Sequence, residues 1–208
     1  VGPMNERQAT FVEKIGQGIV QMSDMVEKIL DAGRLDPETG SYELMCEPTD
    51  LAEVAHKVVA GLSAAAEKKQ LRLTSAIARE VPLLNVDRAM VSSAFTNLVE
   101  NAIKYTPEGG RVTVELRIEG NAVIFRVTDN GLGISPEDQA KLFQRSGRVR
   151  RKEFKRIKGT GLGLFIVKNV AQRHGGDAWV ESVEGKGSTF TWMIPCNGRI
   201  VDDGERSV

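Results

Sequence analysis

The stretch Asn97-Leu-Val-Glu-Asn101-Ala-Ile-Lys104-Tyr105-Thr106 decides the fold, because its polar and apolar residues are arranged at helical spacing. Asn97, Asn101 and Lys104 stand at i, i+4 and i+7, so their side chains share one stripe of a predicted helix. Two amides and an ammonium offer oxygen ligands to a hard cation and positive charge to phosphate oxygens. The apolar side of the helix is supplied by Leu98, Val99, Ala102 and Ile103.

A solvated helix face would look the same, and the motifs that follow are what favour a ligand site. Three glycine-rich stretches come after the helix, namely Asp129-Asn-Gly131-Leu-Gly133-Ile134, Gly159-Thr160-Gly161-Leu162-Gly163-Leu164 and Gly185-Lys-Gly187-Ser-Thr189-Phe190. Glycine lets a backbone approach a ligand closely and adopt a positive φ. A polar helix followed by three such turns predicts a cradle for a nucleotide.

Each glycine stretch suggests a different contact with that nucleotide. Asp129 ends a predicted strand, where its carboxylate can accept a hydrogen bond from an exocyclic amine and so select adenine over guanine. The turn from Gly159 to Gly163 leads directly into a predicted helix, whose first amides can hold phosphate oxygens. Residues 145–158, rich in Arg and Lys, are either a solvated basic loop or a lid over a polyphosphate, and their place between two glycine motifs favours the lid. No Walker loop is present.

Composition excludes several classes of protein. Lys+Arg and Asp+Glu both number 28 among 208 residues, and zero net charge argues against a protein that coats nucleic acid or anionic membrane. Cys46 and Cys196 are too few and too isolated for a zinc site or a disulfide framework, which fits a reducing, cytoplasmic compartment. The sequence has neither an apolar run of membrane-spanning length nor a signal-peptide pattern, and whether a parent protein is membrane-anchored stays open.

The chain divides by its patterns into four parts. Residues 1–4 resemble a cloning scar, 5–36 form a long amphipathic helix, 41–196 form the main domain, and 197–208 form a flexible tail. The long helix is interpreted as half of a dimerising hairpin, with a helix folded back on its own domain as the alternative. The hairpin is favoured because the apolar stripe of this helix is longer than one small domain would cover. The stripe is made of Phe11, Ile15, Ile19, Met22, Val26, Ile29 and Leu30.

Helices and strands alternate through the main domain. Strands are predicted at 41–46, 71–77, 82–86, 111–118, 121–128, 178–183 and 188–194. Helices are predicted at about 49–69, from a cap at Asp87 to a stop at Gly109-Gly110, from Ser135 through Leu142-Phe143, and at 163–174.

In this order the motifs resemble the catalytic ATP-binding domain of sensor histidine kinases, within the superfamily shared with gyrase B and a heat-shock chaperone. Asn97 to Thr106 matches the family's N box, Leu142-Phe143 its F box, and the three glycine stretches its three glycine boxes. The resemblance covers about residues 41–195. It implies an α+β fold, a two-layer α/β sandwich in which helices cover one face of a mixed, largely antiparallel sheet. The long leading helix resembles the second helix of the family's dimerisation hairpin.

The resemblance also implies roles for individual residues. Asn101 would coordinate Mg²⁺ with help from Asn97, and Lys104 and Tyr105 would contact phosphate. Asn97, Asn101 and Lys104 are thereby implied as catalytic. Asp129 would bind the adenine amine, with Thr189 supporting it through water. The remaining implied nucleotide-binding positions are Gly131, Gly133, Ile134, Phe143, Arg148, Gly159, Thr160, Gly161, Leu162, Gly163 and Leu164.

The chain departs from the family in its histidines. Histidine kinases phosphorylate a His on the first hairpin helix, but His56 lacks that motif's acidic neighbour and His174 precedes Gly175-Gly176 at a helix end. We interpret both as structural and expect this fragment to bind Mg·ATP without phosphorylating itself. The expected partners are ATP, a response-regulator receiver domain and a second copy through the hairpin. The alternatives are a degenerate nucleotide-binding scaffold, or a Ser/Thr kinase or ATPase of the same superfamily. Asn97 disfavours the ATPase, because related ATPases carry a water-activating Glu there and an amide is a poor general base.

Overall fold

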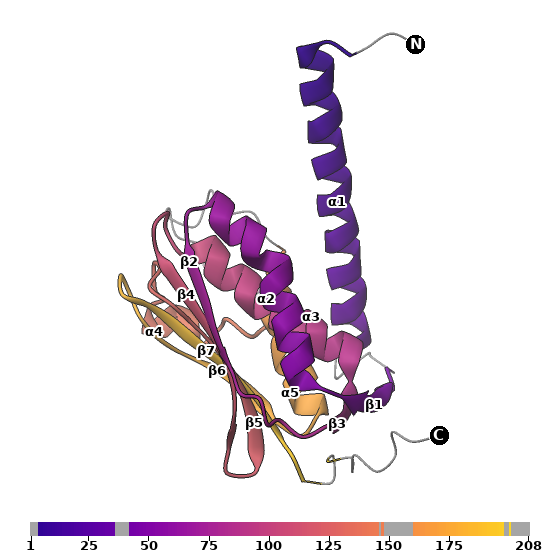
Figure 1. The fold of residues 1–208 in the computed structure, drawn as a ribbon, viewed down its shortest axis with the longest axis vertical. Helices are drawn as coiled ribbons and strands as arrows, with labels where there is room; N and C mark the ends of the chain where they lie inside the picture. Colours follow the sequence, from indigo (N-terminus) through magenta and orange to yellow (C-terminus); the bar gives the residue numbers. More distant parts are fainter. Residues whose placement is uncertain (1–3, 36–41, 146, 148–159, 198–199, 201–208) are drawn as a thin grey trace.

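The computed structural model describes residues 4–35, 42–145, 147, 160–197 and 200. Its described part is a five-stranded main sheet with helices packed on one face and a small two-stranded sheet, preceded by a long helix that projects away from the rest (Figure 1). The elements, in chain order, are α1 (Glu6–Leu35), β1 (Cys46–Thr49), α2 (Leu51–Lys68), β2 (Arg72–Ile77), β3 (Leu84–Asp87), α3 (Arg88–Tyr105), β4 (Arg111–Glu119), β5 (Ala122–Asp129), α4 (Pro136–Gln139), α5 (Gly163–Arg173), β6 (Asp177–Val183) and β7 (Gly187–Pro195).

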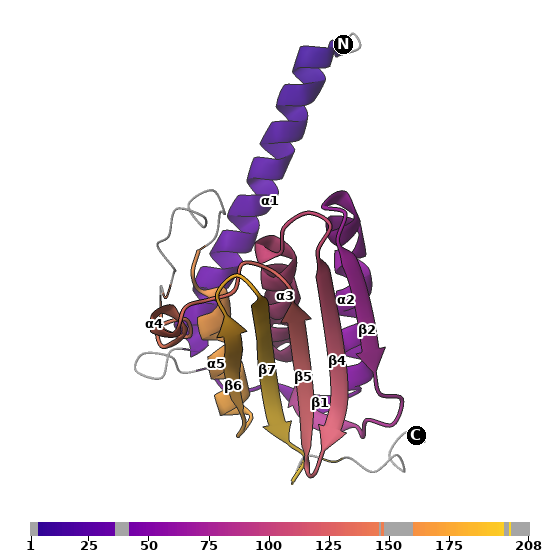
Figure 2. The same cartoon turned by 90° about the vertical axis from the view of Figure 1, so that its left-hand side faces the viewer.

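The main sheet has the strand order β2-β4-β5-β7-β6 (Figure 2). β2 pairs with β4 in parallel, whereas the β4–β5, β5–β7 and β7–β6 pairs are antiparallel. β1 and β3 form a separate antiparallel pair. Helices α2, α3 and α5 lie on one face of the main sheet (Figure 1). The predicted α+β sandwich with a largely antiparallel sheet is therefore confirmed.

Alternation along the strands builds the core between the two layers. The inward residues of β4 and β5 pair across the sheet, as Val114 does with Val127. Under α3, the rings of Phe95 and Phe125 stack with centroids 3.7 Å apart, and Trp192 meets Phe95 edge-on at 5.1 Å. This aromatic cluster fixes α3, the helix with the polar stripe, against the centre of the sheet.

Three predicted elements differ from the observed ones. The first strand is Cys46–Thr49, because its partner is β3 and the register places Cys46 opposite Asp87. α3 ends at Tyr105, before the Gly109-Gly110 pair, with Thr106 as its C-cap. The helix that begins after Ser135 contains only Pro136–Gln139, and Leu142 and Phe143 lie in the turns that follow. In this short helix the Ser135 hydroxyl accepts the Asp138 amide at 3.3 Å, as an N-cap does.

α1 has two ends with different environments. Ala32 and Leu35 near its C-terminus are buried in the main core. From Phe11 to Leu30 the large apolar side chains that the structure describes are exposed, and this part of the helix stands clear of the sheet (Figure 1). The helix is thus anchored at one end and uncovered over most of its length.

Polar contacts fix the chain just after α1. The Tyr42 hydroxyl donates to Asp87 Oδ2 at 2.7 Å, and Arg173 donates to the Tyr42 carbonyl oxygen at 2.8 Å. The Asp87 amide donates to Nε2 of the fully buried His174 at 3.1 Å, and His174 Nδ1 lies 2.7 Å from the Val170 carbonyl oxygen. His174 is therefore a structural residue that ties α5 to β3.

Candidate functional site

A pocket opens between α3, the start of α5 and the C-terminal end of β5. It gathers most of the predicted site residues, although they are spread over the sequence from 97 to 164. Those among its lining residues are Asn97, Asn101, Lys104, Tyr105, Asp129, Gly133, Ile134, Thr160, Gly161, Gly163 and Leu164. The fold therefore brings the polar helix stripe and two of the glycine turns to one cavity.

The amide stripe of α3 faces the glycine turn that begins α5. Asn97 is 4% exposed, and its Nδ2 donates to the Ser93 carbonyl oxygen at 2.9 Å, one helical turn earlier. This bond orients the amide so that Oδ1 is directed at Gly163, where a Cβ would lie only 2.6 Å away. Glycine at 163 thus leaves room for the Asn97 carbonyl oxygen, and both residues line the pocket.

Asp129 lies in the pocket wall at the end of β5 and is 7% exposed. Burial raises the pKa of its carboxyl group to about 6, and backbone hydrogen bonds from Gly131 and Ser188 act in the opposite direction. The Gly131 amide donates to Asp129 Oδ1 at 2.8 Å. A Cβ on Gly131 would lie 2.5 Å from the Tyr105 carbonyl oxygen, so glycine is needed for this turn to reach α3.

Positive backbone φ angles occur where two predicted turns meet the pocket. Gly133 has φ +63° and Gly161 has φ +76°, a region that L-residues with side chains rarely occupy. The N-cap of α5 is Leu162, which makes no side-chain capping bond. The first amides of α5, which no N-cap side chain binds, carry the partial positive charge of a helix N-terminus and suit an anionic ligand.

The cationic side of the pocket comes from the end of α3. Lys104 Nζ lies 5.3 Å from the centroid of the Tyr105 ring, and both residues line the pocket. Lys69, the C-cap residue of α2, binds the C-terminal end of α3. Its Nζ donates to the carbonyl oxygens of Ile103 and Lys104 at 2.8 Å each. Burial lowers the pKa of Lys69.

Six predicted residues are not among those that line the pocket. Gly131 and Leu162 are close in sequence to lining residues. Gly131 shapes the turn after Asp129, and Leu162 is the N-cap of α5. The Phe143 ring instead lies 5.5 Å from Lys168 Nζ. Thr189 Oγ1 lies 3.2 Å from Thr128 Oγ1, away from the Asp129 side of the sheet. Arg148 and Gly159 lie outside the described residues, as does nearly all of the predicted lid.

The pocket also contains residues that the sequence reasoning missed. Ser188 and Phe190 face it because Ser188 pairs directly with Asp129, and strand alternation then turns Thr189 to the other face. Alternation along β7 relates Ser188 to Phe190, but only the register between β5 and β7 places both on the pocket side. Leu142 and Glu100 belong to the F box and the N box, but the resemblance assigns Phe143 and the neighbouring Asn101 to the site. The local sequence contains no signal for Lys28 and Gly147.

The residues present fit a magnesium nucleotide. A buried carboxylate stands among the apolar side chains of Ile134, Leu142 and Phe190, while amide oxygens, Lys104 and a helix N-terminus stand on the α3–α5 side. In the described part of the chain there is no cluster of three His, Cys, Asp or Glu residues that could hold a metal alone. A hard cation here would therefore depend on amide oxygens together with ligand oxygens. No helix in the described residues is long and apolar enough to cross a membrane.

Comparison with known proteins agrees with this geometry. A family described as "Histidine kinase-, DNA gyrase B-, and HSP90-like ATPase" matches residues 86–198. An uncharacterized sensor-like histidine kinase of Rhizobium meliloti is 38% identical over 191 residues, which are 92% of this chain and 36% of that protein. The chain spans between 26% and 47% of the length of the first curated relatives that it matches.

Solved structures share the arrangement as well. Full-length ShkA in complex with AMPPNP is 25% identical, with a TM-score of 0.76 over 97% of this chain and 41% of that chain. The histidine kinase ThkA, solved in complex with the response regulator protein TrrA, shares the fold at 23% identity, with a TM-score of 0.68 over 94% of this chain and 53% of that chain.

Proposed function

Because the chain belongs to the histidine kinase-, DNA gyrase B- and HSP90-like ATPase family, we propose that its pocket binds Mg·ATP for phosphotransfer to a histidine. The acceptor would lie on a first hairpin helix in the parent protein, and a response-regulator Asp would receive the phosphoryl group next. The observation that carries the proposal is the meeting of Asp129 with Asn97, Asn101 and Lys104 in one pocket.

The adenine end of the nucleotide is assigned to Asp129. Its Oδ1 accepts the Gly131 amide at 2.8 Å, and Asp129 and Ser188 both line the pocket. A carboxylate accepts but does not donate hydrogen bonds, so it suits the exocyclic amine of adenine and opposes the carbonyl of guanine. The partly buried Ile134 and the buried Leu142 and Phe190 line the same pocket and offer apolar surface for the ring.

The triphosphate end is assigned to the α3–α5 side of the pocket. Asn101, with Asn97, would hold Mg²⁺, which bridges phosphate oxygens and neutralises the charge that develops during transfer. Lys104 would add positive charge, and the first amides of α5 would bind phosphate oxygens. Tyr105, Gly161 and Thr160 complete the wall there.

Asn97 favours transfer to a protein side chain over hydrolysis. A water-activating residue must accept a proton, and an amide whose Nδ2 is bound to the Ser93 carbonyl oxygen cannot do so effectively. Transfer then depends on positioning and charge neutralisation, with the nucleophilic imidazole supplied from outside the pocket. An amide at position 97 therefore disfavours the ATPase alternative.

α1 is assigned to the dimerisation hairpin, and a homodimer of the parent protein follows from that assignment. Its exposed apolar residues recur every three or four positions, as expected of a helix that packs on other helices. They are Phe11, Val12, Ile15, Ile19, Met22, Met25, Val26, Ile29 and Leu30. The two cysteines are free, which agrees with the proposed cytoplasmic location.

Titration with ATP tests the assignment of the pocket. We expect the chain to bind ATP in the presence of Mg²⁺ by isothermal titration calorimetry, and Asp129→Asn to weaken binding at least tenfold, since one lost charge-assisted hydrogen bond is worth about 1.5–3 kcal/mol. Asp177→Asn is the matched control, because Asp177 lies at the start of β6 and pairs with Lys168 outside the pocket. Equal affinities for the wild type and Asp129→Asn would remove Asp129 from the site.

A second assay separates the kinase from a nucleotide-binding scaffold. Radiolabelled ATP is supplied together with a polypeptide that contains a complete hairpin and its acceptor histidine. The proposed kinase labels the hairpin, and Asn101→Ala abolishes the label. ATP binding without any label on the hairpin would instead favour the scaffold.

A further inference from the structure

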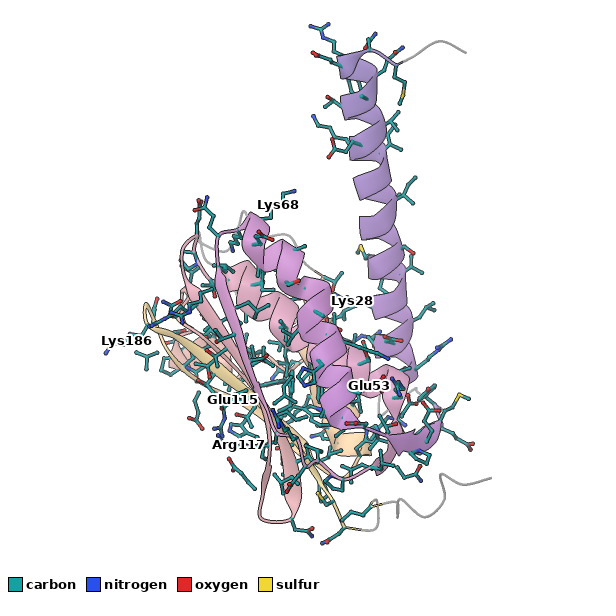
Figure 3. The ribbon with its side chains drawn as sticks, in the orientation of Figure 1. Lys28, Glu53, Lys68, Glu115, Arg117 and Lys186 are labelled. Atoms are coloured by element: carbon teal, nitrogen blue, oxygen red, sulfur yellow. The ribbon has the colours of Figure 1, made fainter. Side chains whose placement is uncertain are left out.

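Lys28 lines the nucleotide pocket although it belongs to α1 and stands 69 positions before Asn97. It lies on the side of α1 that faces the other helices (Figure 3). Its Nζ forms an ion pair with Glu100 Oε2 at 2.9 Å. Glu100 also lines the pocket, so the pair joins the long helix to the wall of the site itself.

Glu100 occupies an unfavourable place for a carboxylate. It immediately precedes Asn101 on α3, on the side of the pocket assigned to Mg²⁺ and phosphate. Among the described lining residues the ionisable side chains with a formal charge are Lys28, Glu100, Lys104 and Asp129, two of each sign. Without Lys28 the described lining residues would carry a net negative charge beside a ligand that is itself an anion.

The docked position of α1 does not depend on this ion pair alone. Ala32 and Leu35 are buried in the core one to two turns later, and Ser93 Oγ lies 3.4 Å from Asp31 Oδ2. The buried C-terminal end of α1 therefore fixes the position of Lys28 at the pocket. The Lys28 and Glu100 side chains are 29% and 40% exposed, so solvent weakens their attraction without removing it.

We propose that Lys28 is a positioning residue of the nucleotide site, which holds the Glu100 carboxylate and cancels its charge next to the triphosphate. The proposal rests on the proposed function, since it requires a triphosphate in this pocket. Its consequence is that the pocket is complete only when α1 is docked. By linkage, ATP then favours the docked arrangement of α1 by the same factor by which docking favours ATP.

A double-mutant cycle on Lys28 and Glu100 tests the proposal. Affinities for Mg·ATP and for adenosine are measured by calorimetry for the wild type, Lys28→Gln, Glu100→Gln and the double variant. We expect Lys28→Gln to weaken ATP roughly tenfold, within the usual range of coupling between sites, and to leave adenosine unchanged. The double variant should bind ATP about as well as the wild type, because it lacks the uncompensated carboxylate. Glu100→Gln should bind ATP at least as tightly as the wild type, because Lys28 then keeps its positive charge beside the triphosphate.

Two further variants control for charge and for folding. Lys28→Arg keeps the positive charge and should keep the ATP affinity. Lys57→Gln removes a lysine from the ion pair with Glu53 on α2, outside the pocket, and should change neither affinity. Thermal unfolding of each variant establishes that it is folded at the temperature of the titration.

Three results would overturn the proposal while leaving the proposed function intact. In one, Lys28→Gln binds ATP like the wild type. In another, it weakens ATP and adenosine equally, which indicates a general structural role. In the third, the double variant remains as weak as Lys28→Gln, which indicates that Lys28 acts without Glu100. A wild type that binds no ATP would instead overturn the proposed function itself.

Discussion

The carboxyl group of Asp129 is buried in the pocket wall, and burial raises its pKa from the ordinary value of 3.8 to about 6. Between those two pH values the folded chain binds more protons than the unfolded chain, so stability falls as pH rises from about 4 to 6 and then stays level. The loss amounts to about 3 kcal/mol, since one pKa unit corresponds to about 1.4 kcal/mol. The group proposed to bind adenine thus destabilises the fold at neutral pH.

Asp129→Asn should therefore stabilise the ligand-free protein at pH 7, by about 1–3 kcal/mol, because it removes the ionisable group. Its advantage should shrink toward zero as the pH falls from about 6 toward 4, because the wild-type carboxyl becomes protonated in the folded state over that range and its burial no longer opposes a charge. Urea unfolding at pH 4, 5, 6 and 7 measures the difference. An advantage of the same size at every pH would show that ionisation of Asp129 does not affect stability.

The glycines of the turns differ in what a side chain would meet, which gives a second prediction for single residues. Gly133 has φ +63°, and a Cβ there would overlap the Val183 carbonyl group. Gly185 has φ +75°, but a Cβ there meets nothing within 4 Å. We expect Gly185→Ala to cost about 1–2 kcal/mol for the left-handed backbone alone, and Gly133→Ala clearly more. Denaturant unfolding compares the two, and equal losses would contradict the overlap.

The sequence predicts pocket residues where residue type and spacing within one element are enough to place them. It does not predict residues that come to the pocket through contacts between elements. Asn97, Asn101 and Asp129 could be predicted because a helical stripe and a strand end place them without reference to other elements. The family resemblance implies Thr189, but the pairing of Asp129 with Ser188 places the Ser188 hydroxyl, and not that of Thr189, on the pocket side. Lys28 reaches the site only because α1 packs on the domain, and its own sequence neighbourhood carries no trace of that contact.

Among the elements, α1 has a buried C-terminal end, whereas its described apolar side chains from Phe11 to Leu30 are exposed. Leu35 is fully buried, whereas Leu30 is 51% exposed. We expect Leu35→Ala to lower the unfolding free energy by about 2–5 kcal/mol, as for other buried leucines, and Leu30→Ala to change it by less than about 0.5 kcal/mol in a monomer. Thermal unfolding at low concentration measures both. Equal effects would mean that the exposed part of α1 is covered by another copy in solution. The melting temperature of the wild type would then rise with protein concentration.

The elements themselves were largely predictable, since α2, α3, α5 and the strands follow clear periodicities and caps. Asp87 caps α3 as expected, with its Oδ1 accepting the Met90 amide at 3.0 Å. The helix predicted through Leu142-Phe143 stops at Gln139, because tertiary contacts hold the chain there. Gln139 Nε2 donates to the carbonyl oxygens of Ile134 and Ser182 at 2.8 Å and 3.0 Å, which fastens the segment to β6. Such contacts override helical propensity and do not appear in a local pattern.

For the whole molecule, the placement of the two histidines decides whether this chain can label itself. His174 is fully buried, and both of its ring nitrogens already have backbone neighbours at 3.1 Å or less. His56 is exposed on α2 and does not line the pocket. Phosphotransfer needs the attacking nitrogen in line with the γ-phosphate, and neither residue meets that condition in this arrangement.

We therefore expect the chain alone, incubated with Mg²⁺ and γ-labelled ATP, to gain no acid-labile, base-stable label. A polypeptide with a complete hairpin should gain that label when it is mixed with the chain, which shows that the enzyme is active in the same tube. His56→Gln is the matched control, and it should leave the labelling of the hairpin unchanged. Acid-labile label on the wild-type chain that disappears in His56→Gln would show that α2 reaches the pocket of another copy, and the acceptor would then lie within this chain.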